Sequence, residues 1–495
     1  MLRVCAVGLA CVVTAACLPD NPDDEVGGES EDNGGSAGDD DDDDDPGAGG
    51  DVLGCPEGES CTLVLVSHTL DDRLEVFSPG DPGVNVFRGA VDLEYKPNVC
   101  EGCQPGDYAD GRLDEPFGVA RAGGFLHVAM GHYPARDSGS LVSFPLSFFE
   151  SRNAGSTIPV ADYFVGMAFQ DPVIQNSLEE LEPIFVSRLG DRLLIGTFNN
   201  DLFATEDNWT IPGKLLVLDA SNPGGSHAEI DLADVGGGTC NGASSVVPLD
   251  DTNVAVACDG NEAVALLDAN ALRNSPLDEL DAGVDGMVCT IPGAMNNRRV
   301  RYVAPDGGGG FIVGEGPTPL DVLSAARLWH FGGDCSMEAF AQLPAEGDWQ
   351  LAELERVPTT SDTWLLASGG ATPTPNRGVY VVRSSGGEIE VCGSLSAFDE
   401  HWDTIDGPIE PFALAITSDG TGLAVGAGPF QAPLSGPGYG KVLWGELSGA
   451  SDPCTMTASV TDLTAGGDGA PAVDPADPLT YRRAPNVVEV VELGG

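Results

Sequence analysis

Short runs of apolar and β-branched residues alternate with Gly, Pro, Asp and Asn from residue 61 to the end of the chain. No part of this stretch keeps the 3.6-residue apolar periodicity of an amphipathic helix over a long span. Short runs of this composition, bounded by turn formers, are typical of β-strands. The pattern therefore predicts an all-β domain.

The strand-like runs recur as a unit, in which an opening strand is followed by a Gly/Asp turn, a second strand, a polar loop and a third strand. The units begin near residues 116, 183, 244, 301, 351 and 411, and residues 62–80 supply the middle of a further unit. A repeat of roughly 40–60 residues with three to four strands is the signature of a β-propeller. We therefore predict a seven-bladed β-propeller over residues 55–495. Two stacked β-sandwiches are the competing architecture.

The last strand-like run, residues 485–493, follows a stretch rich in Pro, Asp and Gly and belongs to none of the repeat units. The unit at 62–80, in turn, lacks an opening strand. An open ring would expose sheet edges, which proteins avoid. We therefore expect the C-terminal run to pair with residues 62–67, complete the first blade and close the ring. Its consecutive valines predict a strand that is buried on both faces.

Residues 1–16 have the character of an export signal. Arg3 precedes 13 small or apolar residues, a run too short to cross the roughly 30 Å hydrocarbon core of a bilayer as a helix. The run ends in Thr-Ala-Ala-Cys, which resembles the lipobox of bacterial lipoproteins. In that family the chain is cut before the cysteine, which is then acylated, so the resemblance implies a signal peptide over 1–16 and a lipidated Cys17. Thr14 departs from the usual Leu or Val, and an ordinary secretory signal with an incidental cysteine is the alternative.

The residue after Cys17 is Leu18, not the Asp that retains lipoproteins in the inner membrane of enteric bacteria. The resemblance to lipoproteins therefore implies the outer membrane. Whether the protein faces the periplasm or the cell surface stays open.

Acidic residues dominate the next segment and the composition as a whole. Residues 18–54 hold 15 acidic and no basic side chains, so we expect residues 17–54 to form a lipidated, disordered acidic linker. The whole chain has 78 acidic and 22 basic residues and a formal net charge of −56. This charge is the wrong sign for a nucleic-acid binder and argues against electrostatic docking on anionic lipid. The expected partners are the membrane, through the lipid anchor, and an envelope protein or small ligand at the propeller mouth.

Ten cysteines remain once Cys5 and Cys11 leave with the signal and Cys17 carries lipid. An even number in an exported chain predicts disulfide bonds and not free thiols. Local spacing favours three pairs and chain order two more, although the sequence leaves the connectivity open. These pairs are Cys55–Cys61, Cys100–Cys103, Cys240–Cys258, Cys289–Cys335 and Cys392–Cys454. No His follows Cys103 and no βαβ pattern surrounds it, so a loop disulfide is favoured there over a haem or redox site.

One acidic loop ahead of the unit at 116 is a candidate calcium site, because hard cations prefer several carboxylate and carbonyl oxygens. Its acids are Asp107, Asp110, Asp114 and Glu115. The loop does not match the second ligand position of the EF-hand pattern, so solvated loop acids are the alternative. A zinc site is not expected, since His127 and His132 are five residues apart and a strand would place them on opposite faces. No other cofactor is expected.

The chain contains no nucleophile-elbow, zinc-protease or P-loop motif, which weakens the case for an enzyme. The repeat units resemble the broad bacterial propeller superfamily that includes the YVTN-type and lactonase-like proteins. We therefore favour a lipid-anchored propeller of the cell envelope that acts as a binding or scaffold module. One alternative is a hydrolase or lactonase, either with or without calcium as a cofactor. Another is a passive structural protein. Three or four carboxylates converging at the mouth of the channel would favour the hydrolase.

Overall fold

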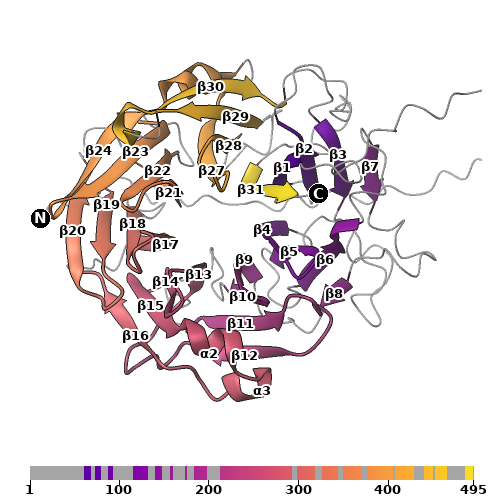
Figure 1. Cartoon of the computed structure of the whole chain (residues 1–495), viewed down its shortest axis with the longest axis vertical. Coiled ribbons are helices and arrows are strands. Elements are labelled where there is room, and N and C mark those ends of the chain that lie inside the picture. The colour runs from indigo at the N-terminus through magenta and orange to yellow at the C-terminus, as the bar shows by residue number, and fades with distance from the viewer. Residues whose placement is uncertain are drawn as a thin grey trace, which may run out of the picture. The chain divides into compact units, whose positions relative to one another are not determined.

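In the computed structural model, strands form at the places where the apolar runs predict them (Figure 1). The structure describes residues 61–68, 73–79, 87–92, 115–131, 140–147, 156–159, 173–175, 183–197, 212–292, 298–317, 326–343, 349, 351–369, 376–404, 407–428, 440–449, 452–464 and 485–493. All of them belong to the unit Gly50–Gly495, which is separate from Met1–Gly49. Within these ranges, no helix has the length and apolar character needed to cross a membrane.

The described strands form sheets that we call blades, numbered in chain order. Blade 1 consists of β31 (Pro485–Leu493), β1 (Cys61–His68), β2 (Arg73–Phe77), β3 (Phe87–Asp92) and β7 (Ser156–Pro159). Blade 2 consists of β4 (Glu115–Ala122), β5 (Phe125–Gly131), β6 (Ser140–Pro145) and β8 (Val173–Gln175). Blade 3 consists of β9 (Pro183–Leu189), β10 (Arg192–Thr197), β11 (Lys214–Asp219) and β12 (His227–Asp231). Within these three blades, neighbouring strands are antiparallel, except that β7 runs parallel to β3.

The remaining blades follow the same order. Blade 4 consists of β13 (Ala243–Pro248), β14 (Asn253–Cys258), β15 (Ala263–Asp268) and β16 (Gly286–Thr290). Blade 5 consists of β17 (Arg298–Pro305), β18 (Phe311–Pro317), β19 (Arg327–Phe331) and β20 (Met337–Gln342). Blade 6 consists of β21 (Leu351–Arg356), β22 (Thr363–Ser368), β23 (Gly378–Ser385) and β24 (Glu388–Ser394), and one parallel bridge from Phe340 to Glu388 joins it to blade 5. Blade 7 consists of β27 (Glu410–Ile416), β28 (Gly422–Gly428), β29 (Lys441–Ser448) and β30 (Thr457–Asp462).

A few short elements connect the blades. They are α2 (Ala269–Asn274), α3 (Leu277–Leu280), the 3₁₀ helices η3 (Ser396–His401) and η4 (Pro453–Thr455), and the hairpin of β25 (Asp403–Thr404) and β26 (Gly407–Pro408). The sequence pattern did not predict these helices, because each is too short to show a helical period.

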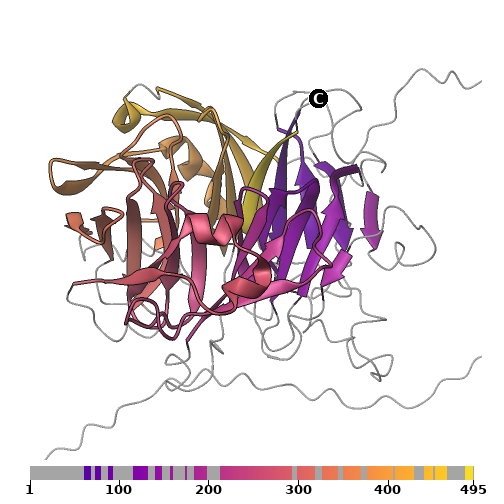
Figure 2. The same cartoon turned by 60° about the horizontal axis from the view of Figure 1, so that its bottom comes forward.

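The blades form a closed ring (Figure 1), and the turned view shows neighbouring blades side by side around it (Figure 2). The innermost strands contact one another in the order β4, β9, β13, β17, β21, β27 and β31, and β31 contacts β4 again. This arrangement is a β-propeller, as predicted from the repeat, and not a pair of sandwiches. Seven blades lie among the described residues.

The C-terminal strand closes the ring. β31 pairs antiparallel with β1 from Cys61 opposite Leu493 to His68 opposite Pro485, which confirms the expected pairing. The expectation that its valines are buried on both faces is confirmed for Val488 and Val491, which lie in different core clusters, whereas Val487 and Val490 are only partly buried. β31 is the innermost strand of its blade, so no further strand covers its inner edge.

The hydrophobic core lies between the faces of neighbouring blades. Leu63 and Leu65 of β1 pack with Val119 and Val128 of blade 2. The alternate residues Val64 and Val66 belong to a cluster with blade 7. Because successive side chains of a strand point to opposite faces, a middle strand buried between two blades is apolar at every position. This explains continuous runs such as β22 and β28, where every residue is buried.

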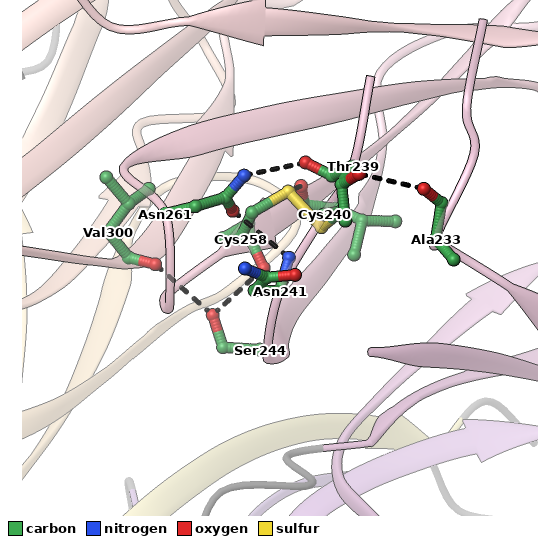
Figure 3. The surroundings of a disulfide bond; sticks show 10 residues. Ala233, Thr239, Cys240, Asn241, Ser244, Cys258, Asn261 and Val300 are labelled. Atoms are coloured by element: carbon green, nitrogen blue, oxygen red, sulfur yellow. Dashed lines mark hydrogen bonds between the residues drawn. A yellow bond between two sulfur atoms is a disulfide. The ribbon is translucent and has the colours of Figure 1, made fainter. Parts of the chain in front are cut away.

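Three disulfides lie among the described residues, each as the spacing and chain order predicted. Cys240–Cys258 joins the segment between blades 3 and 4 to the end of β14 (Figure 3). Cys289–Cys335 links β16 of blade 4 to the turn before β20 of blade 5. Cys392–Cys454 links β24 of blade 6 to η4, next to β30 of blade 7. Cys61 is also disulfide-bonded. Cys55, Cys100 and Cys103 lie outside the described residues, so their pairings stay predictions.

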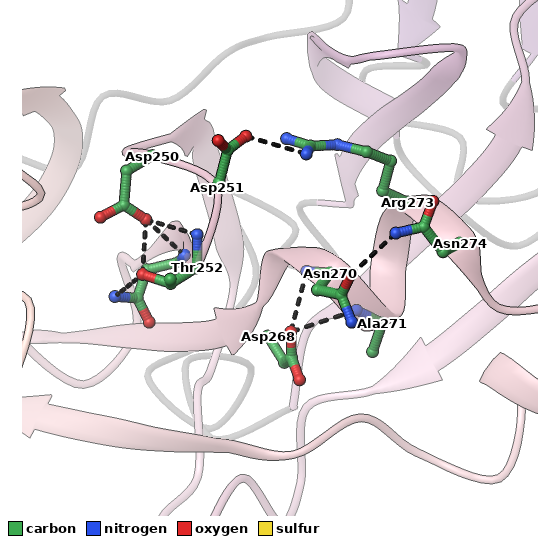
Figure 4. Close-up of polar contacts among 9 residues, drawn as sticks. Asp250, Asp251, Thr252, Asp268, Asn270, Ala271, Arg273 and Asn274 are labelled. Carbon is green, nitrogen blue, oxygen red and sulfur yellow. Dashed lines mark hydrogen bonds and ion pairs between the residues drawn. The ribbon is translucent and has the colours of Figure 1, made fainter.

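Aspartates shape the turns between strands. Asp250 accepts hydrogen bonds from the backbone N–H and the hydroxyl of Thr252, both at 2.6 Å (Figure 4). In the same view, Asp268 caps α2 by accepting from the N–H groups of Asn270 and Ala271. The Asp-x-Ser/Thr turn recurs at Asp219, Asp334, Asp419 and Asp462. Part of the chain's acidity therefore stabilises turns, since an Asx-turn satisfies backbone N–H groups that no strand pairs.

Candidate functional site: three carboxyls near the axis of the ring

Three glutamates on innermost strands lie close enough for their charges to interact. Glu353 and Glu355 are on β21 of blade 6, and Glu489 is on β31 of blade 1. We call this group the axial carboxyls. Blade 7 lies between blades 6 and 1 in the ring, so the carboxyls interact across its inner end.

Strand periodicity places the two glutamates of β21 on one face. Glu353 pairs in register with Ala367 and Glu355 with Leu365, and both partners belong to the core cluster shared with blade 7. Glu353 therefore reaches blade 7, where its Oε2 accepts the backbone N–H of Leu414 at 2.5 Å. This hydrogen bond holds Glu353 against β27.

Burial perturbs the ionisation of all three groups. Each side chain is half-buried, because the strands surround it while part of it stays accessible. Burial raises the pKa of Glu355 to about 7, although the positive charge of Arg356 lowers it in part. Burial also raises the pKa of Glu489 to about 8, and the nearby charge of Glu355 raises it further. The pKa of Glu353 is also raised well above its usual value, chiefly by burial. At neutral pH the axial carboxyls therefore hold protons that an approaching cation could displace.

The axial carboxyls do not form a ready-made metal cage. Within the described part of the chain, the one group of three potential ligands close enough to hold an ion is Glu390, Cys392 and Cys454. Those two cysteines form a disulfide and offer no thiolate. Three axial carboxyls could ligate one ion only after their side chains move together, whereas a larger or hydrated cation could interact with them at longer range.

The sequence-predicted site residues have different outcomes. Several of them lie outside the described residues: Cys17, Asp107, Asp110, Asp114 and His132. Lipidation and the calcium loop therefore stay predictions. Glu115, the last acid of that loop, is the first residue of β4. His127 is fully buried on β5, where Nδ1 accepts from the Ser143 hydroxyl at 2.8 Å and Nε2 donates to the Ala122 carbonyl at 3.2 Å. Burial lowers the pKa of His127 to about 4, so the ring is neutral and serves the core.

Sequence reasoning did not single out the axial carboxyls. Their signal is a glutamate at alternate or every third position inside an otherwise apolar strand run, as in LAELER and VVEVVE. A charged residue inside a strand that packs in the core is uncommon without a partner, so such positions deserve a functional hypothesis. Only the ring closure shows that the two runs lie near each other.

A Ser–His–Asp arrangement lies between blades 5 and 6. His330 Nδ1 is 2.9 Å from Ser384 Oγ, and His330 Nε2 is 3.2 Å from the Asp306 carboxylate. However, Ser384 and His330 are only 8% and 6% exposed, and Asp306 also holds its own turn by accepting from the N–H groups of Gly308 and Gly310. This set therefore joins two blades and does not present a nucleophile. The turn consists of glycines 307–310 and is closed by the backbone N–H of Asp306, which donates to the Gly310 carbonyl at 3.0 Å.

Comparison with known proteins gives distant similarities. No protein-family model and no curated protein sequence matches the chain. Among solved structures, the chain is similar to apo AztD from Citrobacter koseri, with 11% identity and a TM-score of 0.44 over 88% of this chain and 99% of that one. It is also similar to the GH74 xyloglucanase from Xanthomonas campestris, with 13% identity and a TM-score of 0.45 over 83% of this chain and 54% of that one.

Proposed function

We propose that this protein is a lipid-anchored binding module of a bacterial cell envelope, and that its propeller takes a cationic ligand at the axial carboxyls. The observation that carries the ligand class is the group of three interacting carboxyls on innermost strands, where the positive charge of Arg356 acts on Glu355. The lipid anchor is supported by the Thr-Ala-Ala-Cys sequence that ends at Cys17 and by the acidic linker behind it.

Cation binding at this group must be coupled to proton release. Because Glu355 and Glu489 have pKa values of about 7 and 8, a cation competes with protons at neutral pH. Calorimetric titration with calcium chloride at pH 6 and pH 8.5 tests this. We expect tighter binding at pH 8.5, proton release at pH 7, and at least a tenfold weaker affinity in Glu355→Gln or Glu489→Gln, since hydrogen bonds and ion pairs to a charged partner are at stake.

The exposed Glu279 on α3 offers a matched control. Glu279→Gln removes the same charge from the surface and should leave the affinity unchanged. Equal weakening in the three variants, or binding that does not depend on pH, would rule out the axial carboxyls as the site.

The lipid anchor has its own test. Cys17→Ser should abolish labelling by a fatty acid and release the protein from the membrane fraction. Labelling that persists in Cys17→Ser would contradict the lipoprotein hypothesis.

A hydrolase is the second candidate, because Glu355 and Glu489 have pKa values suited to general acid–base catalysis near neutral pH. Hydrolysis of chromogenic esters and of simple lactones, with and without calcium, tests this function. An enzyme would lose activity in Glu355→Gln and keep it in Glu279→Gln. A wild-type protein without turnover on either substrate class would leave only the binding module.

A further inference from the structure

A pocket lies at the seam where the C-terminal strand closes the ring. It has a volume of about 370 Å³, about ten times the share of a water molecule in the liquid, so it is too large for a single metal ion. We call it the seam pocket. It is lined by Thr62 of β1, Pro79 after β2, Thr421 and Gly422 at the start of β28, and Trp444, Glu446 and Leu447 of β29. Its walls therefore come from blade 1 on one side and blade 7 on the other.

One wall is a fixed aromatic ring. Trp444 is only 8% exposed, and its six-membered ring lies against Gly422. A Cβ atom at Gly422 would come within 2.3 Å of two carbons of that ring, so the glycine permits the close approach. Pro79 and Leu447 add apolar surface. Most of the accessible lining is nevertheless polar, so a ligand would be held mainly by hydrogen bonds and charge.

The polar groups of the seam pocket are mainly hydrogen-bond acceptors. The exposed side chain of Glu446 has no hydrogen-bond or ion-pair partner among the described residues, so its carboxylate is available to a ligand. Thr421 donates its hydroxyl proton to Asp419 at 2.7 Å, which leaves its oxygen as an acceptor. A ligand with several donors would match this set better than one with acceptors.

The charge around the seam pocket is negative. Asp419 lies behind Thr421, and Glu492 is opposite Thr62 in the β1–β31 pairing, where its carboxylate accepts the Ser418 hydroxyl. None of the lining residues is basic. Arg121 reaches the same end of β31, where its guanidinium donates to the backbone carbonyl of Glu492. A positively charged donor is therefore favoured over a neutral polyol or an anion.

We propose that the seam pocket binds a small organic amine. Its ammonium group would bind Glu446, a second donor would reach the Thr421 hydroxyl oxygen, and its short carbon chain would span the space between them. This site is separate from the axial carboxyls and does not depend on the proposed function. Because its walls belong to both blades that β31 joins, an occupant stabilises the closed ring by mass action.

The probes are 1,4-diaminobutane and 1,4-butanediol, which have the same length but differ in charge. Each is titrated into the purified full-length protein at constant ionic strength, with tryptophan fluorescence and the melting temperature as readouts. We expect saturable binding of the diamine, a rise in melting temperature, and no saturable binding of the diol. Glu446→Gln should weaken diamine binding at least about tenfold.

Two control variants distinguish the seam pocket from the rest of this acidic protein. Glu400→Gln removes an exposed charge on η3, and Glu279→Gln removes an exposed charge on α3. Both should bind the diamine as the wild type does. Equally weakened diamine binding in Glu446→Gln and Glu400→Gln would show general attraction to the acidic surface. Diamine binding that is weakened in Glu355→Gln but not in Glu446→Gln would place the amine at the axial carboxyls. Tighter binding of the diol than of the diamine would show a polyol site. Each of these results overturns the proposal.

Discussion

Glu355 and Glu489 make the stability of this protein depend on pH in a direction opposite to most carboxylates. Their pKa values in the folded state are about 7 and 8, above the ordinary 4.5, so the folded chain holds more protons than the unfolded chain between about pH 4.5 and 8. The free energy of unfolding should therefore fall as pH rises through this window. In Glu355→Gln/Glu489→Gln the fall should be smaller, and the variant should be more stable than the wild type at pH 8.5. Urea midpoints measured at several pH values test this, and an unchanged slope would mean that the two groups titrate normally.

Gly123 and Gly124 allow backbone strain and close approach to be separated within one turn. Both have positive φ angles, +57° and +84°, so alanine is strained at either position. At Gly123 a Cβ atom would also lie 2.3 Å from the Ala220 carbonyl carbon of blade 3, while at Gly124 it would meet nothing within 4 Å. We expect Gly123→Ala to lower the free energy of unfolding by about 1–3 kcal/mol more than Gly124→Ala. Similar losses in both variants would mean that the turns of blades 2 and 3 are not in contact.

At the scale of elements, β31 is the part on which the ring depends most. Removing residues 485–493 exposes the edge of β1 and takes away Val488 and Val491, which are buried in two different core clusters. Each fully buried side chain of this kind stabilises the fold by about 1.5–3 kcal/mol, a large share of the 5–15 kcal/mol of a typical domain. We therefore expect truncation before Pro485 to give a protease-sensitive or aggregating protein. A truncated protein that melts within a degree or two of the full-length chain would contradict this.

At the scale of the whole molecule, the acidic segment and the propeller should be thermodynamically independent. The segment 18–54 consists mainly of Pro, Gly, Ser, Asn and acidic residues and has few apolar side chains to bury. Deleting residues 18–54 behind an intact lipobox should leave the melting temperature of the propeller unchanged. A clear fall in melting temperature would show that this segment contributes to the fold.

The sequence alone determined the repeat, the closing strand and the local disulfides. Apolar runs and turn residues are short-range signals, so the strands of each blade could be read one unit at a time, and the spare run at 485–493 followed from counting. Cys240–Cys258 followed from spacing for the same reason. The partial exposure of Val487 and Val490 could not be predicted from the sequence, because it depends on the position of β31 as the innermost strand of its blade.

Only the tertiary structure decided which residues can act together. Glu355 and Glu489 are 134 residues apart in the sequence, and Thr62 and Glu446 are 384 residues apart. Ring closure places each pair at one site, whereas no pattern along the chain refers to residues that far apart. Strand periodicity is a property of neighbours in sequence, but burial, charge interaction and pocket shape belong to neighbours in space. The sequence therefore specified the blades, and the closure of the ring decided where this protein can bind.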